Sequence, residues 1–296
     1  MFPQLKQELI SQASILTPIE EYDGVLYKRD DLFSPFEYIP INGGKLRQCI
    51  TLIDKLEDRI RDDFNGKVAT ACGLHSPQGL IVTSVAKVFG FNAMVAYANS
   101  KSIDHLLEKN PIIRRIDELG GEVKIIAKLG FESNMQKKLK QIILEGKDIF
   151  FVVKFGINLE EHSDAIIDSI SCQVKNIPND LDNLVVPVGS GITAAGIIKG
   201  LIQYEKQPKN LYLIQIAGYD RTDTIDRIVP LWRLYCDFEF ISYKEFPYSK
   251  RVVQKITEDF ELDQIYESKA YRWMQGRDLE GKTLFWVVGN GNKARE

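Results

Sequence analysis

The sequence predicts an α/β protein with two three-layer lobes, each built on a mostly parallel sheet that helices cover on both faces. Short, fully apolar runs alternate with longer helical patterns along the chain, and the alternation occurs in both halves. A length of 296 residues provides enough chain for two such units. The sequence contains no linker, low-complexity segment or repeat between them.

In the first half, a strand at residues 26–32 runs into paired acids, and a helix opens within 42–56. Four apolar runs then predict strands at residues 67–72, 92–98, 122–127 and 149–153. Helical patterns separate these strands, at residues 79–90, 103–121 and about 134–145. Gly90 closes the first of these helices and Pro111 interrupts the second.

The second half continues the alternation of helix and strand. A helix is expected at about residues 161–175, and another follows the next strand as far as Ile202. Strands are expected at residues 183–189, 211–218 and 283–289.

Composition indicates a soluble cytoplasmic protein. Hydrophobic residues make up 44% and charged residues 27% of the chain, which is ordinary for a globular protein. A net charge of −3 gives no general attraction to nucleic acid or to an anionic membrane. Residues 1–12 lack the apolar core of a signal peptide, and no apolar run approaches the roughly 18 residues of a membrane-spanning helix. The four cysteines, which form no CxxC pair and indicate reduced thiols rather than disulfides or a zinc site, are Cys49, Cys72, Cys172 and Cys236.

A glycine-rich turn follows the strand at residues 183–189. It consists of Gly189, Ser190, Gly191, Ile192 and Thr193, and a helix of small residues begins at once. Such a turn lets backbone N–H groups converge at the positive end of a helix, at the sheet edge where α/β proteins bind ligands. The pattern therefore indicates a phosphate site, although it is neither a P-loop nor a full dinucleotide fingerprint. A tight turn with glycines for packing is the alternative.

Lys45 stands directly after two glycines at a predicted helix start. The positive end of the helix dipole lowers the pKa of an amine placed there, which favours a Schiff-base nucleophile. A solvated lysine in the first turn is the commoner outcome for this pattern alone.

Four motifs in one order resemble the fold-type-II pyridoxal phosphate (PLP) enzymes, and most closely the 1-aminocyclopropane-1-carboxylate (ACC) deaminase and D-cysteine desulfhydrase family. "LTPIEEY" with "VLYKRDDL" resembles the family's opening segment, and "NGGKLR" its lysine motif. "VGSGITAAG" resembles its phosphate loop, and "LDQIYESKAYRWM" its segment with a conserved tyrosine. The resemblance covers most of the chain. It implies PLP bound between the lobes, a large domain of residues 1–47 and 159–296, a small domain of residues 48–158, and a homodimer.

The resemblance also implies roles for individual residues. Lys45 would be the Schiff-base lysine and would move the proton at the substrate α-carbon. Tyr266 would face the substrate as acid, base or nucleophile, and Glu267 would lie at the pyridine nitrogen, where a carboxylate strengthens the electron sink. The cofactor phosphate would be held by the turn from Gly189 to Thr193, including Ile192. Without the resemblance, Tyr266 and Glu267 would be an ordinary pair at a helix start.

Two positions depart from the family. Gly44 stands where relatives carry an asparagine beside the lysine, and Pro77 stands where they carry an asparagine beneath the substrate carboxylate. Proline offers no N–H and no side-chain amide. His75, Ser76 and Gln78 remain in that loop as the expected substrate-binding residues, with His75 as a donor near the ring or as a satisfied loop histidine.

Two segments outside these motifs have open interpretations. Residues 33–41 are aromatic-rich and would line an enlarged pocket or pack the lobes together. Residues 242–255 interleave cations with aromatics, and we expect a solvated helix with an apolar face. A patch for a phosphorylated or polymeric substrate is the alternative.

Three hypotheses follow for function. The first is a PLP enzyme that eliminates or deaminates at the α-carbon of an amino acid or related amine. The second is a PLP decarboxylase or lyase that acts on an amino-acid moiety carried by a larger substrate, such as a modified nucleotide or DNA, although the net charge does not support a nucleic-acid partner. The third is a relative that binds without catalysis.

Overall fold

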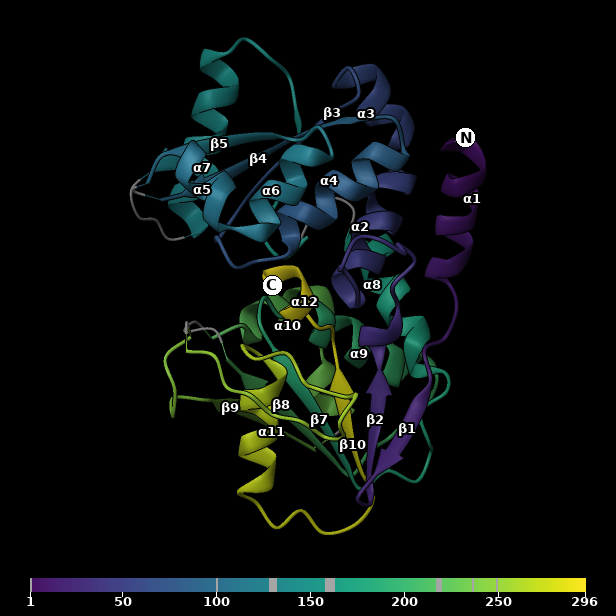
Figure 1. Ribbon diagram of the computed structural model, residues 1–296. Helices are drawn as coiled ribbons and strands as arrows, with labels where there is room; N and C mark the ends of the chain where they lie inside the picture. Colours follow the sequence, from purple (N-terminus) through teal and green to yellow (C-terminus); the bar gives the residue numbers. More distant parts are fainter. Residues whose placement is uncertain are drawn as a thin grey trace.

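The computed structural model describes residues 2–99, 101–127, 132–157, 163–216, 220–235, 237–248 and 250–296. Within these ranges the chain forms two sheets, one in each lobe, with helices against both faces of each sheet (Figure 1). The two-lobed α/β fold predicted from the sequence is therefore confirmed.

The larger sheet has six strands in the order β1-β2-β10-β7-β8-β9. The antiparallel pair of β1 (Ile19–Tyr22) and β2 (Val25–Arg29) forms one edge, and the other neighbours are parallel. The remaining strands are β7 (Asn183–Val188), β8 (Asn210–Gln215), β9 (Asp237–Ser242) and β10 (Thr283–Val287). β10, which comes last in the sequence, pairs in parallel with β2 on one side and with β7 on the other. The carboxyl ends of these three strands therefore lie next to one another along the same edge of the sheet.

Alternate residues of β7 face opposite layers of this lobe. Leu184 and Val186 pack in the cluster that includes α8 (Ser163–Ser171) and α9 (Ile192–Gln203), whereas Val185 packs in the cluster with α11 (Glu267–Gln275). Both faces of the strand are buried, which explains its continuous apolar run. The lobe also contains α10 (Thr222–Ile228) and the short helix α12 (Asn292–Arg295).

The smaller sheet is wholly parallel, in the order β5-β4-β3-β6. Its strands are β3 (Lys67–Cys72), β4 (Asn92–Ala98), β5 (Glu122–Ala127) and β6 (Phe151–Val153). One face packs with α4 (Gln78–Val88) and α6 (Pro111–Glu118), and the other with α7 (Glu132–Glu145). The helix α5 (Ile103–Lys109) ends just before Pro111, which begins α6 as its first residue. The predicted interruption at Pro111 is therefore confirmed.

The helix α2 (Gly44–Lys55) lies between the two lobes, where it packs against α8 and α4. It is followed by α3 (Glu57–Asp63), and α1 (Phe2–Ala13) packs on its outer side (Figure 1). The predicted domain boundary at residues 47 and 48 falls inside α2. The other predicted boundary, at residues 158 and 159, lies outside the described residues, as do residues 161–162 of a predicted helix and 217–218 of a predicted strand.

The helix expected at residues 242–255 is a wrong prediction. The described residues after Ser242 form no helix there, and Val252 N–H bonds to Gln264 O instead of to its own segment. The carbonyls of Pro247 and Tyr248 accept hydrogen bonds from Lys269 Nζ at 2.9 and 2.8 Å. Pro247 disfavours helical backbone in the residue before it and has no N–H to donate within a helix. The segment is instead a loop, and residues 247 and 248 contact α11 through Lys269.

No helix in the described part of the chain has the length and apolar character needed to cross a membrane. The cytoplasmic location and the homodimer stay predictions.

Candidate active site

A cavity of about 780 Å³, counting its open mouth, lies where β7 and β10 end and where α2, α9 and α11 begin. Five of the residues assigned to the cofactor or to catalysis share its wall with the amine-bearing Lys45: Gly189, Ser190, Gly191, Thr193 and Tyr266. Glu267 also lines it, whereas Ile192 is buried behind the wall. The structure thus brings together predicted site residues from three distant parts of the sequence.

Lys45 lies in the first turn of α2. The turn before it depends on Gly43, whose φ of 85° and ψ of −172° belong to a region that only glycine occupies readily. Burial lowers the pKa of Lys45, while the nearby carboxyl groups of Asp263 and Glu267 act in the opposite direction. Its Nζ lies 5.9 Å from the ring centroid of Tyr266 and has no hydrogen bond among the described residues. An amine with a lowered pKa and no hydrogen-bond partner is available to react with an aldehyde.

The glycine-rich turn ends in the uncapped start of α9. Gly191 stands at the N-cap with a φ of 87° and provides no side-chain cap. The first N–H groups of the helix therefore lack an intrahelical partner and carry the positive end of its dipole. A side-chain carbon at Gly189 would lie 3.0 Å from Tyr266 Cε1, so glycine lets the tyrosine ring approach the turn. This geometry fits a bound phosphate.

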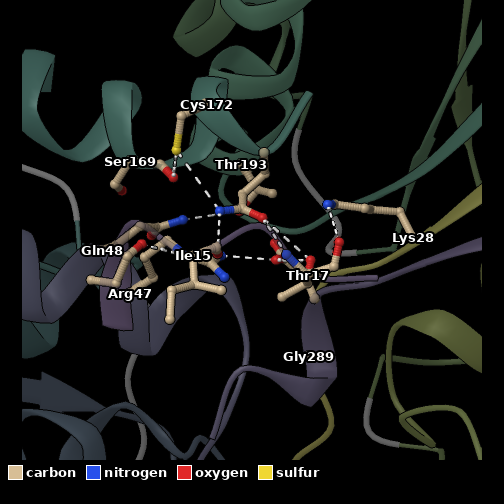
Figure 2. Close-up of polar contacts among 12 residues, drawn as sticks. Ile15, Thr17, Lys28, Arg47, Gln48, Ser169, Cys172, Thr193 and Gly289 are labelled. Atoms are coloured by element: carbon tan, nitrogen blue, oxygen red, sulfur yellow. Dashed lines mark hydrogen bonds and ion pairs between the residues drawn. The ribbon is translucent and has the colours of Figure 1, made fainter. Parts of the chain in front are cut away.

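A hydrogen bond joins the lysine helix to the glycine-rich turn. Gln48 Nε2 donates to Thr193 Oγ1 at 3.2 Å (Figure 2). On the same helix, Arg47 Nη1 forms a fully buried ion pair with Asp30 Oδ1 at 2.8 Å, and Thr17 Oγ1 donates to the same oxygen. These contacts fix α2 against the large sheet, so the position of Lys45 relative to the turn is set by buried bonds.

Glu267 begins α11, and Tyr266 is the N-cap residue of that helix. Burial raises the pKa of Tyr266 well above its usual value, and the hydroxyl of Tyr248 lies 2.8 Å from its own. The phenol therefore keeps its proton near neutral pH, and either hydroxyl of the pair can donate to the other. Burial also raises the pKa of Glu267, whose Oε1 accepts the Gly289 N–H at 3.2 Å. A cation placed next to Glu267 would favour its ionised form.

Comparison with known proteins adds to this geometry. No family model matches the chain. It is 28% identical over 337 residues to the O-seryl-dTMP PLP-dependent decarboxylase of Salmonella phage ViI, covering 90% of this chain and 78% of that protein. The crystal structure of an ACC deaminase homologue superposes with a TM-score of 0.71 at 20% identity, covering 99% of this chain and 96% of that one. The processed threonine deaminase isoform 2 of Solanum lycopersicum gives 0.61 at 15% identity, covering 97% and 89%.

The chain has the fold of the fold-type-II PLP enzymes. Its structural neighbours and its curated relative are PLP-dependent enzymes: deaminases, lyases and one decarboxylase. The fold that the four motifs indicated is therefore confirmed. The roles of the individual residues stay predictions, which the geometry of the cavity supports unequally.

The loop after β3, which the resemblance assigns to substrate binding, contributes fewer residues to the cavity wall than the sequence predicts. Pro77 lines the wall, but His75, Ser76 and Gln78 do not. The amide of Gln78 is buried and committed elsewhere: its Nε2 donates to Thr70 and to Lys154 O, and its Oε1 accepts the Gly156 N–H at 2.8 Å. Ser76 Oγ accepts the N–H of Gln78 at 3.3 Å. These contacts hold the loop in place, so Gln78 and Ser76 support Pro77 rather than reach into the cavity.

The sequence prediction did not name several residues of the cavity wall, among them the polar residues Asn290, Asp263 and Arg295. Asp263 and Arg295 form an ion pair at 2.8 Å in which each side chain is only 4% exposed. Asp263 lies within a motif that the sequence singled out, three residues before Tyr266. Arg295 is next to the last residue, and nothing in its local sequence marks it. Residues 33–41 contribute Pro40 and Ile41 to the wall, as one of the two interpretations expected.

Proposed function

We propose that this chain is a PLP-dependent enzyme that removes CO₂ from an amino-acid moiety carried by a larger, nucleotide-type substrate. One observation carries the choice of reaction. The cavity wall where the resembling family has a carboxylate-binding asparagine is formed here by Pro77, with Ile81 beside it. The named activity of the phage relative gives independent support.

The residues of the cavity fit PLP. The uncapped start of α9, with its glycine-rich turn, would hold the phosphate, and the unpaired amine of Lys45 would bind the aldehyde carbon. Glu267 would pair with the pyridine nitrogen, which would reverse the effect of burial on its carboxyl group. When bound, PLP supplies a sink for the electron pair left at the substrate α-carbon.

The wall at Pro77 and Ile81 favours loss of the carboxylate. Neither side chain donates a hydrogen bond, and the amide of Gln78 already has its own partners. An ionised carboxylate is costly to hold against an apolar surface, whereas neutral CO₂ is not. As the bond between the α-carbon and the carboxylate breaks, its electron pair stays on the α-carbon and CO₂ leaves.

Lys45 and Tyr266 would complete the reaction by handling protons. The amine of Lys45, with its lowered pKa, returns a proton to the α-carbon, where a C–H bond replaces the lost C–C bond. Tyr266 keeps its own proton and would donate a hydrogen bond to the substrate from the cavity wall. The product is an amine that remains attached to the larger group.

Elimination or deamination is the second candidate. The likeness to an ACC deaminase homologue over 99% of this chain favours it. In that reaction the α-proton leaves first and the carboxylate stays, so a group that holds the carboxylate should increase the rate.

The substitution Pro77→Asn discriminates between the two reactions. Pro77 is the N-cap of α4, a position where asparagine is favoured, so the variant should fold. The purified chain, loaded with PLP, is given serine joined through its side-chain oxygen to dTMP, and separately D-cysteine and ACC. Mass spectrometry should find the first substrate lighter by one CO₂, with a rate roughly tenfold lower in Pro77→Asn. Efficient release of ammonia from the free amino acids, made faster by the substitution, would contradict the proposal.

A further inference from the structure

Arg295 is the cavity residue to which no role has yet been given. It ends α12, which lies between the two lobes (Figure 1). In the small lobe, Arg115 of α6 donates to the carbonyl of Ala294 at 3.1 Å, which ties α12 to that lobe. The side chain of Arg295 is only 4% exposed, yet it forms part of the cavity wall. It is therefore a buried cation facing a ligand-sized space.

Three contacts fix the guanidinium of Arg295 in place. Its Nη1 donates to Asp263 Oδ2 at 2.8 Å and to Asn292 Oδ1 at 3.2 Å. Its Nε donates to the His75 carbonyl at 3.1 Å, which belongs to the small lobe. Asp263 is fixed in turn, because its carboxylate accepts the N–H groups of Tyr266 and Gly291. Little side-chain freedom remains to be lost when Arg295 binds a ligand.

The remaining nitrogen of this guanidinium, Nη2, has no hydrogen bond in the described part of the chain. It lies beside Gly291, where an added side-chain carbon would come within 2.8 Å of it. Gly291 lines the cavity too. Two N–H donors on this one nitrogen are thus left over beside the wall, and an anionic oxygen of a phosphate or carboxylate can accept from them.

The charges around this point favour an anion. Burial lowers the pKa of His75, and the positive charges of Arg251 and Arg295 lower it further. The imidazole is then neutral and adds no repulsion to the two arginines. Of the two acids in the cavity wall, Asp263 is already paired with Arg295, and Glu267 would pair with the cofactor's pyridine nitrogen.

We infer that Arg295 binds a phosphate group of the substrate, at a second anion site in the same cavity as the glycine-rich turn at Gly189. The site would take a nucleoside monophosphate unit, free or within a polynucleotide strand, that carries the amino-acid moiety. This inference rests on the proposed function for the identity of the attached group, but the phosphate contact itself does not require turnover.

The test is equilibrium binding to the PLP-loaded protein, so that the cofactor already occupies the glycine-rich turn. Calorimetry compares dTMP with thymidine, which lacks the phosphate. We expect dTMP to bind at least tenfold more tightly, since a hydrogen bond to a charged group contributes about 1.5–3 kcal/mol. Two variants should remove that difference. Arg295→Lys keeps the charge beside Asp263 but loses the Nη2 donors, and Gly291→Ala keeps Arg295 but crowds its Nη2.

Equal binding of dTMP and thymidine, or an unchanged ratio in both variants, would overturn the inference. Gly291→Ala changes no charge, so it answers the question even if Arg295→Lys fails to fold. If dTMP binding behaves as expected but no CO₂ is released from the seryl nucleotide, the proposed reaction fails and the phosphate site stands. If CO₂ is released equally fast from seryl-thymidine with and without the phosphate, the site fails and the reaction stands.

Discussion

Adjacent glycines before Lys45 should respond in opposite ways to the same substitution. A side-chain carbon at Gly43 would lie 2.5 Å from Val288 O and 2.6 Å from Gly289 Cα, and both are backbone atoms that cannot turn aside. At Gly44 the nearest atom is Asp30 Oδ2 at 3.4 Å, which is an ordinary contact. Gly43→Ala should therefore damage the site, and Gly44→Ala serves as its matched control.

The magnitude for Gly43→Ala follows from two costs. The backbone conformation, with φ of 85° and ψ of −172°, costs an alanine about 1–3 kcal/mol. Displacing the 288–289 backbone costs about 1–3 kcal/mol more. The sum of about 2–6 kcal/mol should lower Tm by about 4–12 °C in a chain of this size. Gly44→Ala lies in the first turn of α2 with ordinary backbone angles, so it should gain about 0.4–1 kcal/mol.

Thermal unfolding followed by circular dichroism measures the stability of both variants. Titration with PLP, followed by the visible absorbance of the lysine-bound cofactor, measures whether Lys45 is still in position. Gly43→Ala should bind PLP more weakly, because the displaced 288–289 backbone forms part of the cavity wall. The reasoning is refuted if both variants melt within about 1 °C of each other and bind PLP equally well.

Three further predictions concern single side chains. Lys45→Ala should abolish the visible absorbance of lysine-bound PLP and lower kcat by about a thousandfold or more; a normal spectrum would exclude Lys45 as the cofactor lysine. Tyr266→Phe should leave that spectrum intact and lower kcat by roughly a hundredfold, because the phenol donates a proton or hydrogen bond without holding the cofactor; a loss of PLP binding instead would contradict this division of roles. Burial lowers the pKa of Lys28 from 10.5 to about 8. Between these two values the unfolded chain binds a proton that the folded chain does not, so stability contributed by this site rises with pH in that window. Lys28→Met should lack this rise in urea denaturation at pH values across it, and parallel curves for the two proteins would refute the assignment.

The sequence predicts the buried strands best. The strands at residues 67–72, 92–98 and 122–127 form with the expected bounds, and the first two are buried along most of their length, which requires a nearly continuous apolar run. The edge strands β1 and β9 went unnoticed, since their residues are half-buried or exposed and carry charges. The predicted strands ending at residues 189 and 289 stop at residues 188 and 287, because the glycines after them form turns at the cavity.

The candidate site contains residues that a local motif identifies and residues that only long-range contacts bring to the cavity. The turn at Gly189 is a local motif, so the strand and helix that flank it identify it from sequence alone. Arg295 acquires a site only because β10 inserts between β2 and β7, which brings the chain's end to the cavity. The amide of Gln78 is taken up by Gly156 and Lys154, some 76 to 78 residues away in sequence, and no local pattern reveals that.

Carbon labelling shows directly whether the bond between the α-carbon and the carboxylate breaks. The substrate is seryl-dTMP with ¹³C in its carboxyl group, incubated with the PLP-loaded protein. We predict that the label appears in CO₂ and bicarbonate and that no ammonia is released. Lys45→Ala should release no label as CO₂ or bicarbonate. Label retained in a keto acid, together with one ammonia for each substrate consumed, would contradict decarboxylation and assign the chain to the deaminases.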